Sequence, residues 1–405
     1  ASSSGTLNIG AAAADPAAAP GTLSATSLEF GSGTGTLVFN HTGTNYIFSA
    51  PLSGGSSALS SIQHVAGTTV LTGDGSGFAG TTTISGGTLA VSDAFGGSVS
   101  IGSGTTFLLL QSDDRTFSNT LSGSGTLEKR FSGTSTLSGA NTGFSGPVTL
   151  TDGTLAISSA DNLGTGTLTF TGGTLGMTGN TTIANSVSVA SPEVATVSVS
   201  DGVVATMSNT VSGSGGVNKM GAGTLVLTGT NAYSGETYVS GGTLSVAADG
   251  NLGSGTVWIY DATLQLTADT TIDNQVWVSA TSPTVSVDAG VSATFSNTVT
   301  GFSGLTKTGA GTLTLSATNS YPGTTTVSEG TLSIASDSNL GTDSVTFDGG
   351  TLAVTATTTI DNDFVVDSGG GRLSMASGIS VTTSGVLSGT GTLTKAGAGT
   401  LLPTA

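Results

Sequence analysis

The sequence contains no cysteine among its 405 residues. This absence excludes disulfide bonds, thiol catalysis and metal sites built on cysteine. A chain of this length that works outside the cell therefore has to depend on a long, continuous core.

Positive charge is also scarce. Seven Lys and Arg residues stand against 24 Asp and Glu residues, which gives a formal net charge of −17. A polyanion such as DNA or RNA would be repelled, so nucleic acid is excluded as a partner. An anionic membrane surface is disfavoured for the same reason. We expect the acidity mainly to maintain solubility.

Long apolar runs are missing as well. No stretch approaches 18 consecutive apolar residues, so the sequence predicts no membrane-spanning helix. The chain also shows no signal peptide at its start. If the protein is secreted, we expect this sequence to be a mature or trimmed form.

Glycine is abundant, with 65 residues, and most apolar residues are Val, Leu, Ile or Ala beside Thr. This composition favours strands, because β-branched side chains suit a pleated surface. One tripeptide, Gly-Thr-Leu, recurs along almost the whole chain. It begins at Gly5, Gly21, Gly35, Gly87, Gly125, Gly153, Gly166, Gly173, Gly223, Gly242, Gly311, Gly330, Gly350, Gly391 and Gly399. Such recurrence predicts a repeat protein whose units bury each other's apolar faces.

The tripeptide lies within a longer repeat. The motif Lys-x-Gly-Ala-Gly-Thr-Leu starts at Lys219, Lys307 and Lys395, with a step of 88 residues. We therefore predict one continuous solenoid rather than separate domains. Its predicted parts are an N-terminal section (1–65), a short unit (66–130), repeat units at 131–218, 219–306 and 307–394, and the truncated start of a further unit (395–405).

The fold predicted from these patterns is all-β, a right-handed single-stranded parallel β-helix. Short segments alternate in period two, and Gly, Asn and Asp separate them every few residues. With coils of roughly 20–25 residues, an 88-residue unit makes about four coils and the chain about 18. Asn162, Asn251 and Asn339 are expected at equivalent corners, where Asn tolerates a left-handed conformation and bonds its own turn. Two prolines make the alanine-rich segment 11–20 a predicted loop.

The segment from Gly223 to Leu244 resembles the passenger-associated repeat of bacterial autotransporters, and Gly311 to Leu332 is a second good copy. The resemblance implies a β-helical passenger domain exported through the outer membrane of a Gram-negative bacterium and displayed at the cell surface. Such passengers are commonly adhesins or aggregation factors, and some carry enzymes. Neither the family's translocator barrel nor its signal sequence is in this sequence. Attachment to the outer membrane would therefore require a translocator absent from this chain.

The search for catalytic groups is mostly negative. No Gly-x-Ser-x-Gly elbow occurs in the sequence, and the two histidines, His41 and His64, are expected to be ordinary surface or corner residues. The glycine pattern from Gly75 to Gly80 precedes a strand-like Thr81-Thr-Thr-Ile rather than the helix that a dinucleotide site needs. We therefore predict no catalytic residue and no cofactor.

No metal site is predicted either. Asp113-Asp114 and Asp361-Asn-Asp363 could offer oxygen ligands to calcium, but solvated acidic corners are the favoured interpretation. The lysines at the 88-residue step are interpreted as repeat architecture.

One signal points to a surface. When the units are aligned at the 88- or 89-residue step, four aromatic residues of the unit from Lys219 match polar or small residues elsewhere, which predicts that they face outward. Tyr238 matches Thr149 and Thr326, Trp258 matches Thr169 and Thr346, Tyr260 matches Thr171 and Asp348, and Trp277 matches Ser188 and Val365. Exposed aromatic side chains often mark contact with sugar or protein. These four residues are the candidate interaction surface.

The predicted function is that of a non-catalytic extracellular or cell-surface passenger acting in adhesion, self-association or a biofilm matrix. The predicted partners are the chain itself, associating laterally or head to tail, or a host or cell-surface glycan or protein. Two alternatives stay open. A β-helix without polar caps at its ends suggests the subunit of a head-to-tail fibre, and coils can also assemble a polysaccharide-active enzyme.

Overall fold

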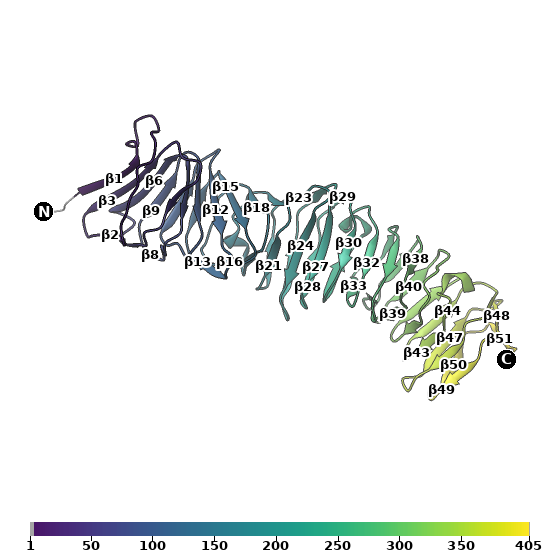
Figure 1. Cartoon of the computed structure of the whole chain (residues 1–405). Helices are drawn as coiled ribbons and strands as arrows, with labels where there is room; N and C mark the ends of the chain where they lie inside the picture. The colour runs from purple at the N-terminus through teal and green to yellow at the C-terminus, as the bar shows by residue number, and fades with distance from the viewer. Residues whose placement is uncertain (1–3, 405) are drawn as a thin grey trace. The chain divides into compact units, whose positions relative to one another are not determined.

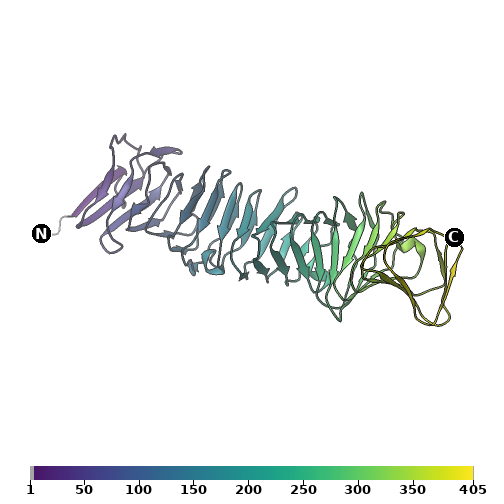
Figure 2. The ribbon, with the colours of Figure 1, turned by 90° about the horizontal axis from the view of Figure 1, so that it is seen from below.

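A computed structural model describes residues 4–404. The described chain is all-β, and its strands stack in parallel as the coils of a β-solenoid, which confirms the predicted parallel β-helix. It divides into two compact units, Ala1–Ser198 and Val199–Ala405. In each unit the strands of successive coils lie side by side (Figures 1 and 2). No helix in the described part is long and apolar enough to cross a membrane.

The first unit has three faces of stacked strands at its N-terminal end. One sheet comprises β1 (Ser4–Gly10), β3 (Thr34–Asn40), β6 (Ser60–Ala66), β9 (Thr81–Ile84), β11 (Ser98–Ile101), β14 (Leu121–Gly123) and β17 (Gly143–Phe144). A second comprises β4 (Tyr46–Phe48), β7 (Thr68–Leu71), β10 (Thr88–Val91), β12 (Thr106–Leu110), β15 (Thr126–Arg130), β18 (Val148–Leu150), β20 (Leu168–Phe170) and β23 (Val187–Val189). The third face is formed first by β2 (Leu28–Phe30), β5 (Leu52–Gly54) and β8 (Gly77–Phe78). Further strands of the unit are β13 (Arg115–Phe117), β16 (Thr134–Leu137), β19 (Thr154–Ile157), β21 (Thr174–Met177), β22 (Thr181–Ile183) and β24 (Val194–Val199).

The second unit contains three long sheets, here called sheets I, II and III. Sheet I comprises β27 (Gly216–Met220), β30 (Thr237–Val239), β32 (Val257–Ile259), β35 (Val276–Val278) and β38 (Val299–Gly301). Sheet II comprises β25 (Val204–Met207), β28 (Thr224–Leu227), β31 (Thr243–Val246), β33 (Thr263–Leu266), β36 (Thr284–Val287), β39 (Leu305–Thr308), β41 (Thr325–Val327), β43 (Val345–Phe347), β46 (Phe364–Val366) and β49 (Leu387–Gly389). Sheet III comprises β34 (Thr270–Ile272), β37 (Ser292–Phe295), β40 (Thr312–Leu315), β42 (Thr331–Ile334), β44 (Thr351–Val354), β47 (Gly371–Met375) and β50 (Leu393–Ala396). Shorter sets are β26 (Val211–Gly213) with β29 (Ala232–Tyr233), and β45 (Thr358–Ile360) with β48 (Ser380–Thr383) and β51 (Thr400–Pro403).

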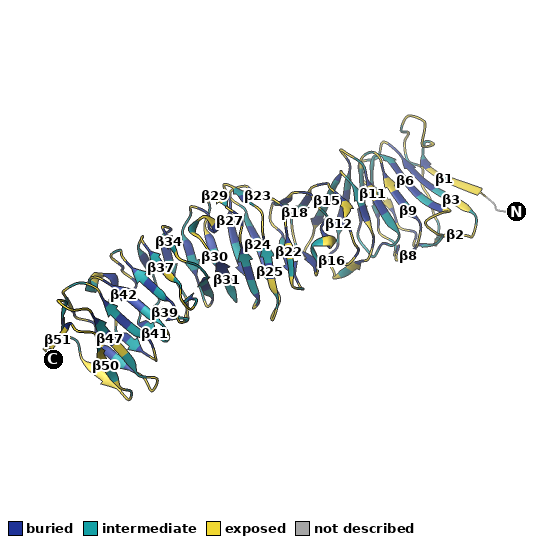
Figure 3. Ribbon diagram, turned by 180° about the vertical axis from the view of Figure 1, so that it is seen from behind, coloured by how far each residue is buried: buried dark blue, intermediate teal, exposed yellow. Residues whose placement is uncertain are grey.

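The core lies inside the coils, because the period-two pattern sends alternate side chains inward. Buried residues are distributed along the strands of both units (Figure 3). The leucine of the tripeptide is fully buried in most copies; examples are Leu225, Leu244, Leu313, Leu332 and Leu352. The copy at Gly21 is an exception, because it lies in a loop and its Leu23 is 38% exposed. The alanine-rich segment 11–20 contains no helix, as predicted.

The corner asparagines bond their own turns as predicted, but through a different backbone conformation. Each ends a short 3-10 helix: η1 (Ala160–Asn162), η2 (Asp249–Asn251) and η3 (Asp337–Asn339). The Asn251 Oδ1 accepts hydrogen bonds from the amides of Ala247 and Ala248 at 3.0 and 2.9 Å. None of these asparagines has a positive φ. The expected left-handed conformation is therefore wrong, because a 3-10 turn already brings the side chain to these amides.

The 88-residue repeat is longer than four coils. In sheet I the paired residues Lys219, Val239, Ile259, Val278 and Gly301 follow one another by 19 to 23 residues. The next unit then begins at Lys307 on sheet II, and Lys395 lies on sheet III. Each unit thus makes four coils plus one further side of the coil. Equivalent residues of successive units consequently lie on different faces.

Candidate interaction surface

Sheet I places three of the four predicted surface residues at paired positions. Tyr238 pairs with Trp258, and Trp258 pairs with Trp277, on β30, β32 and β35. The flanking residues of β32, Val257 and Ile259, are fully buried, so the pleat turns the aromatic side chain between them outward. All three aromatic side chains are half-buried.

These three rings form a stack that runs from coil to coil, here called the aromatic stack. The centroids of the two indole rings lie 4.7 Å apart with 26° between their planes. The Tyr238 and Trp258 rings lie 6.3 Å apart at 28°. Offset stacking of this kind contributes about 0.5–1.5 kcal/mol per pair beyond the apolar area that it buries.

Two further aromatic residues adjoin the stack. Tyr260 directly follows β32, and its ring lies 6.4 Å from the Trp258 ring at 16°. Phe302 directly follows β38, and its ring meets the Trp277 ring edge-on, at 5.4 Å and 73°. Phe302 is 77% exposed. The structure therefore brings Tyr238, Trp258, Tyr260 and Trp277 together, and adds Phe302 to them.

Phe302 was not among the predicted surface residues, although the same alignment of units contains the signal. At the 88-residue step Phe302 matches Ser214 and Thr390. It meets the criterion of an aromatic residue where other units are polar. We call Tyr238, Trp258, Tyr260, Trp277 and Phe302 the aromatic face.

The two indole N–H groups lack hydrogen-bond acceptors. The Nε1 atoms of Trp258 and Trp277 are covered by neighbouring atoms, and neither has a partner in the described chain. An unsatisfied buried donor costs about 1–3 kcal/mol, so most such groups in proteins are paired. The stack therefore holds two donors that an acceptor from outside could satisfy after a small side-chain movement.

Polar side chains surround the aromatic face. The Tyr238 hydroxyl donates to the Glu236 carboxylate at 2.6 Å, and this bond raises the pKa of Tyr238 to about 12. Ser240 donates to the Asn218 side chain at 2.7 Å. Lys219 is the one basic residue on the strands of sheet I, and it is fully buried. The face consequently presents hydroxyls, amides and a carboxylate, without an exposed cation on its strands.

Three lysines lie in the interior of the coils. Lys129, Lys219 and Lys307 are fully buried, and each Nζ donates to backbone carbonyls. Lys219 reaches the carbonyls of Met220, Gly221 and Gly241 at 2.9, 2.8 and 2.9 Å. Burial lowers the pKa of all three lysines to about 8. For Lys219 and Lys307, the interpretation as repeat architecture thus has a physical basis, because the ammonium group satisfies the carbonyls of a tight corner. Lys395, the third lysine at the 88-residue step, is exposed.

Both histidines are buried rather than exposed, so the expectation of surface histidines is wrong. The His41 Nδ1 accepts the Gly43 amide at 3.1 Å, so its Nε2 carries the proton and donates to the Thr69 hydroxyl at 2.8 Å. The His64 Nδ1 donates to the Gly86 carbonyl at 2.8 Å, and its Nε2 accepts from the Thr69 hydroxyl at 3.1 Å. Burial lowers the pKa of both rings, that of His64 to about 4. Every imidazole nitrogen is satisfied only while both rings are neutral.

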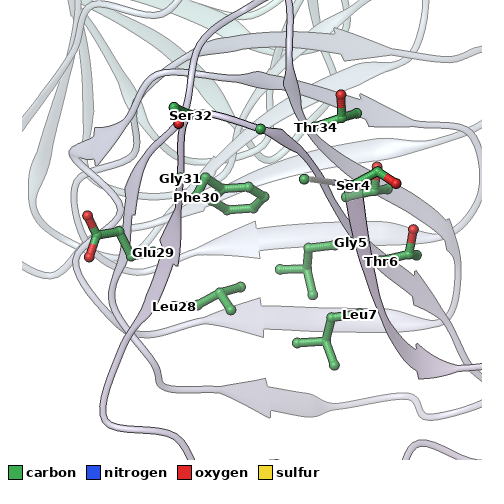
Figure 4. Close-up of a pocket in the computed structure, with 14 residues that line it drawn as sticks. Ser4, Gly5, Thr6, Leu7, Leu28, Glu29, Phe30, Gly31, Ser32 and Thr34 are labelled. Carbon is green, nitrogen blue, oxygen red and sulfur yellow. The ribbon is translucent and has the colours of Figure 1, made fainter. Parts of the chain in front are cut away.

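The pocket near the N-terminus, strand β9 and the acidic corners do not bring several reactive side chains together. A pocket of about 660 Å³ is lined by β1, β2 and the start of β3, with Leu7, Leu28 and Phe30 at its apolar side and Glu29 as its one ionisable residue (Figure 4). Thr81–Ile84 forms β9, which agrees with the strand expected after Gly80. Within residues 4–404, no group of three or more His, Cys, Asp or Glu side chains is placed to hold a metal ion. Asp114, at one of the acidic corners, instead accepts the Thr134 amide at 2.8 Å.

Comparisons with known proteins bear on the repeat. The model of the passenger-associated transport repeat matches residues 66–91, 130–157, 217–246 and 305–334. A curated relative, the adhesin BmaC autotransporter of Brucella suis biovar 1 (strain 1330), is 34% identical over 159 residues. The match covers 37% of this chain, which spans only 5% of the relative's length. No solved structure matches the chain. The resemblance to autotransporter passengers with these repeats is confirmed.

Proposed function

We propose that this chain, which carries passenger-associated transport repeats, is part of a passenger displayed at the bacterial surface and acts there in adhesion without catalysing a reaction. It would work by binding a glycan or protein of another surface, or by self-association of the kind that builds a biofilm matrix. The repeat family supports extracellular display, since these repeats accompany exported passengers.

The observation that carries the proposal is the aromatic face. Five aromatic side chains lie together, three on strands of sheet I and two directly after its strands, and Phe302 is 77% exposed. Aromatic residues are enriched where proteins contact ligands and partners. The matching positions of the other units hold mainly Thr and Ser, which shows that the solenoid forms without aromatic residues there.

The relative supports an adhesive role by its name, adhesin. Both histidines and three of the lysines form hydrogen bonds within the described chain. His41 and His64 bond Thr69 and the backbone, and three lysines bond corner carbonyls. Adhesion needs no such groups, because contacts spread over a face suffice.

The proposal can be tested with beads coated with the full chain. We expect coated beads to adhere to cultured cells or to one another more than beads coated with serum albumin. A variant without the stack, Trp258→Thr with Trp277→Ser, should lose most of this adhesion. It should still fold, since Thr and Ser occur at the matching positions of other units. Coated beads that adhere no better than the albumin control would overturn the proposal.

The purified chain also distinguishes adhesion from the two alternatives, the head-to-tail fibre and the polysaccharide-active enzyme. Filaments of the purified chain under the electron microscope would support the head-to-tail fibre instead. Release of reducing sugar from a polysaccharide panel would support an enzyme. Each outcome would replace adhesion as the primary activity only if bead adhesion were absent.

A further inference from the structure

We infer that the aromatic face binds a neutral saccharide, with Tyr260 and Phe302 as the rings that contact it and the aromatic stack as their support. This inference rests on the proposed adhesive function and names its ligand class. Three features of the molecule support it: the exposure of the rings, the unpaired donors and the charge around the face.

The rings differ in what their faces touch. Trp258 lies between Tyr238 and Trp277 in the stack, and Phe302 meets the far side of Trp277. These ring faces are therefore largely used within the protein. At the register of Tyr260, in contrast, the neighbouring coils hold only Ser240 and Ser279, as the parallel amide bonds show. Tyr260 therefore has no ring beside it on the adjacent coils; its ring contacts Trp258 of its own coil and is half-buried. Phe302 is largely exposed.

A pyranose ring suits such a surface. Its C–H groups carry partial positive charge and pack on the negative face of an aromatic ring. Its hydroxyls, which lie at the rim, then need donors and acceptors at the edge of the aromatic surface. The structure supplies both kinds: the Glu236 carboxylate and the Asn218 side-chain oxygen are acceptors, and the Asn218 amide nitrogen is a donor, while the Ser240 hydroxyl already donates to Asn218.

The unpaired indole N–H groups add a second, independent observation. Trp258 and Trp277 each hold one buried donor without an acceptor. A hydroxyl oxygen of a bound sugar could accept one of them once the indole turns slightly outward. Satisfying such a donor recovers part of its desolvation cost, which favours a ligand rich in acceptors over a purely apolar one.

The charge around the aromatic face disfavours an anionic glycan and a second copy of the chain as ligands. The strands of sheet I offer no exposed cation to pair with a uronate, sulfate or phosphate group, so an anionic glycan is disfavoured. A second copy would bring its own net charge of −17 and a second Glu236 to the contact. A basic protein would satisfy the charge, so polylysine is included among the probes to test for this occupant.

The test uses the full chain and two readouts. In affinity electrophoresis the chain migrates through gels that contain mannan, amylose or galactan as neutral probes, heparin as an anionic probe, or no polysaccharide. Tryptophan fluorescence gives the second readout, because the only two tryptophans of the chain both lie in the stack. Any spectral change on titration with a soluble neutral oligosaccharide therefore reports on this face.

Three variants separate binding from folding. Tyr260→Thr with Phe302→Ser removes the proposed contact rings and leaves the stack intact. A transplant variant places Thr326→Tyr, Thr346→Trp, Asp348→Tyr and Val365→Trp on sheet II, where Thr326, Thr346 and Val365 are paired and half-buried like the originals. Phe131→Ser removes an exposed aromatic residue of the first unit, outside this face, and serves as the control.

We expect at least one neutral polysaccharide to retard the chain and to change its fluorescence, with an affinity about tenfold or more lower in the Tyr260→Thr/Phe302→Ser variant. The control should bind as the parent does, and the transplant should bind more. Equal retardation of parent and Tyr260→Thr/Phe302→Ser variant would overturn the inference, as would binding to heparin or to polylysine alone. Adhesion of coated beads without any neutral-sugar binding would refute the ligand class and leave the adhesive function standing. Absence of both would refute the two together.

Discussion

Trp258 and Trp277 occupy paired positions on β32 and β35, and their indole centroids lie 4.7 Å apart. Parallel in-register pairing causes this contact, because it places identical side chains one coil apart at the spacing of stacked strands. The relationship makes the tryptophans both a stabilising contact between coils and the centre of the candidate surface. These two roles can be separated by experiment.

The stacked indoles should be visible in solution. Two coupled indoles produce an exciton couplet in circular dichroism, and Trp258→Thr should abolish it because one chromophore remains. We expect the free energy of unfolding to fall by about 1–3 kcal/mol, from the lost ring contact and apolar burial. Phe131→Ser should leave the couplet unchanged. Persistence of the couplet in Trp258→Thr would show that it does not come from this pair.

The burial of Lys307 and the exposure of Lys395 predict that these two lysines of the same motif contribute unequally to stability. Lys307→Ala removes an ammonium that donates to the carbonyls of Thr308 and Gly309 at 2.6 and 2.7 Å. We expect a loss of about 3 kcal/mol in the free energy of unfolding, since buried carbonyls lose their donor. Lys395→Ala alters an exposed lysine of the same motif and should cost less than about 0.5 kcal/mol. Denaturant titration of both variants checks this, and equal losses would contradict the assigned role.

The three buried lysines predict a rise in stability at alkaline pH. Their pKa of about 8 in the folded chain lies below the ordinary value of 10.5. Between these values the unfolded chain binds more protons, so the free energy of unfolding increases as the pH rises from 8 toward 10. Burial raises the pKa of Tyr233 and Tyr321, which opposes this increase above pH 10. Unfolding measured at pH 7, 8, 9 and 10 should show the rise, and a Lys129→Met/Lys219→Met/Lys307→Met variant should not.

The histidine pair predicts a loss of stability in mild acid. The pKa values of His41 and His64 are lowered from 6.5, that of His64 to about 4. The unfolded chain therefore binds more protons in this window, so stability falls as the pH drops from 6.5 toward 4. Hydrogen exchange should report the loss in β3, β6 and β7, which carry or adjoin the pair. His64→Gln should reduce the pH dependence, and an unchanged profile would assign it to other groups.

The sequence predicted most of the inner and outer positions. Comparison of the units predicted that Trp258 faces outward, and its strand neighbours Val257 and Ile259 are buried, because a period-two pattern that recurs at fixed spacing has one consistent interpretation in a stacked sheet. The domain boundaries and the role of the four aromatic residues stay predictions.

Three features of the structure could not be predicted from the sequence. Successive coils in sheet I differ in length by up to four residues, so the extra side in each unit cannot be read from the 88-residue period. A lysine is normally expected at the surface, and its burial depends on corner carbonyls that only the fold brings together. The shared bonds of His41 and His64 to Thr69 arise because residues 28 positions apart become neighbours on adjacent coils.

The most direct test of the account is adhesion of beads coated with the chain, with its Trp258→Thr/Trp277→Ser variant, and with that variant carrying the transplanted aromatic residues on sheet II. The account predicts adhesion by the parent chain, its loss in the variant and its recovery in the transplant, because the aromatic face and not its position on the solenoid supplies the binding. Equal adhesion by the parent and the variant would contradict it.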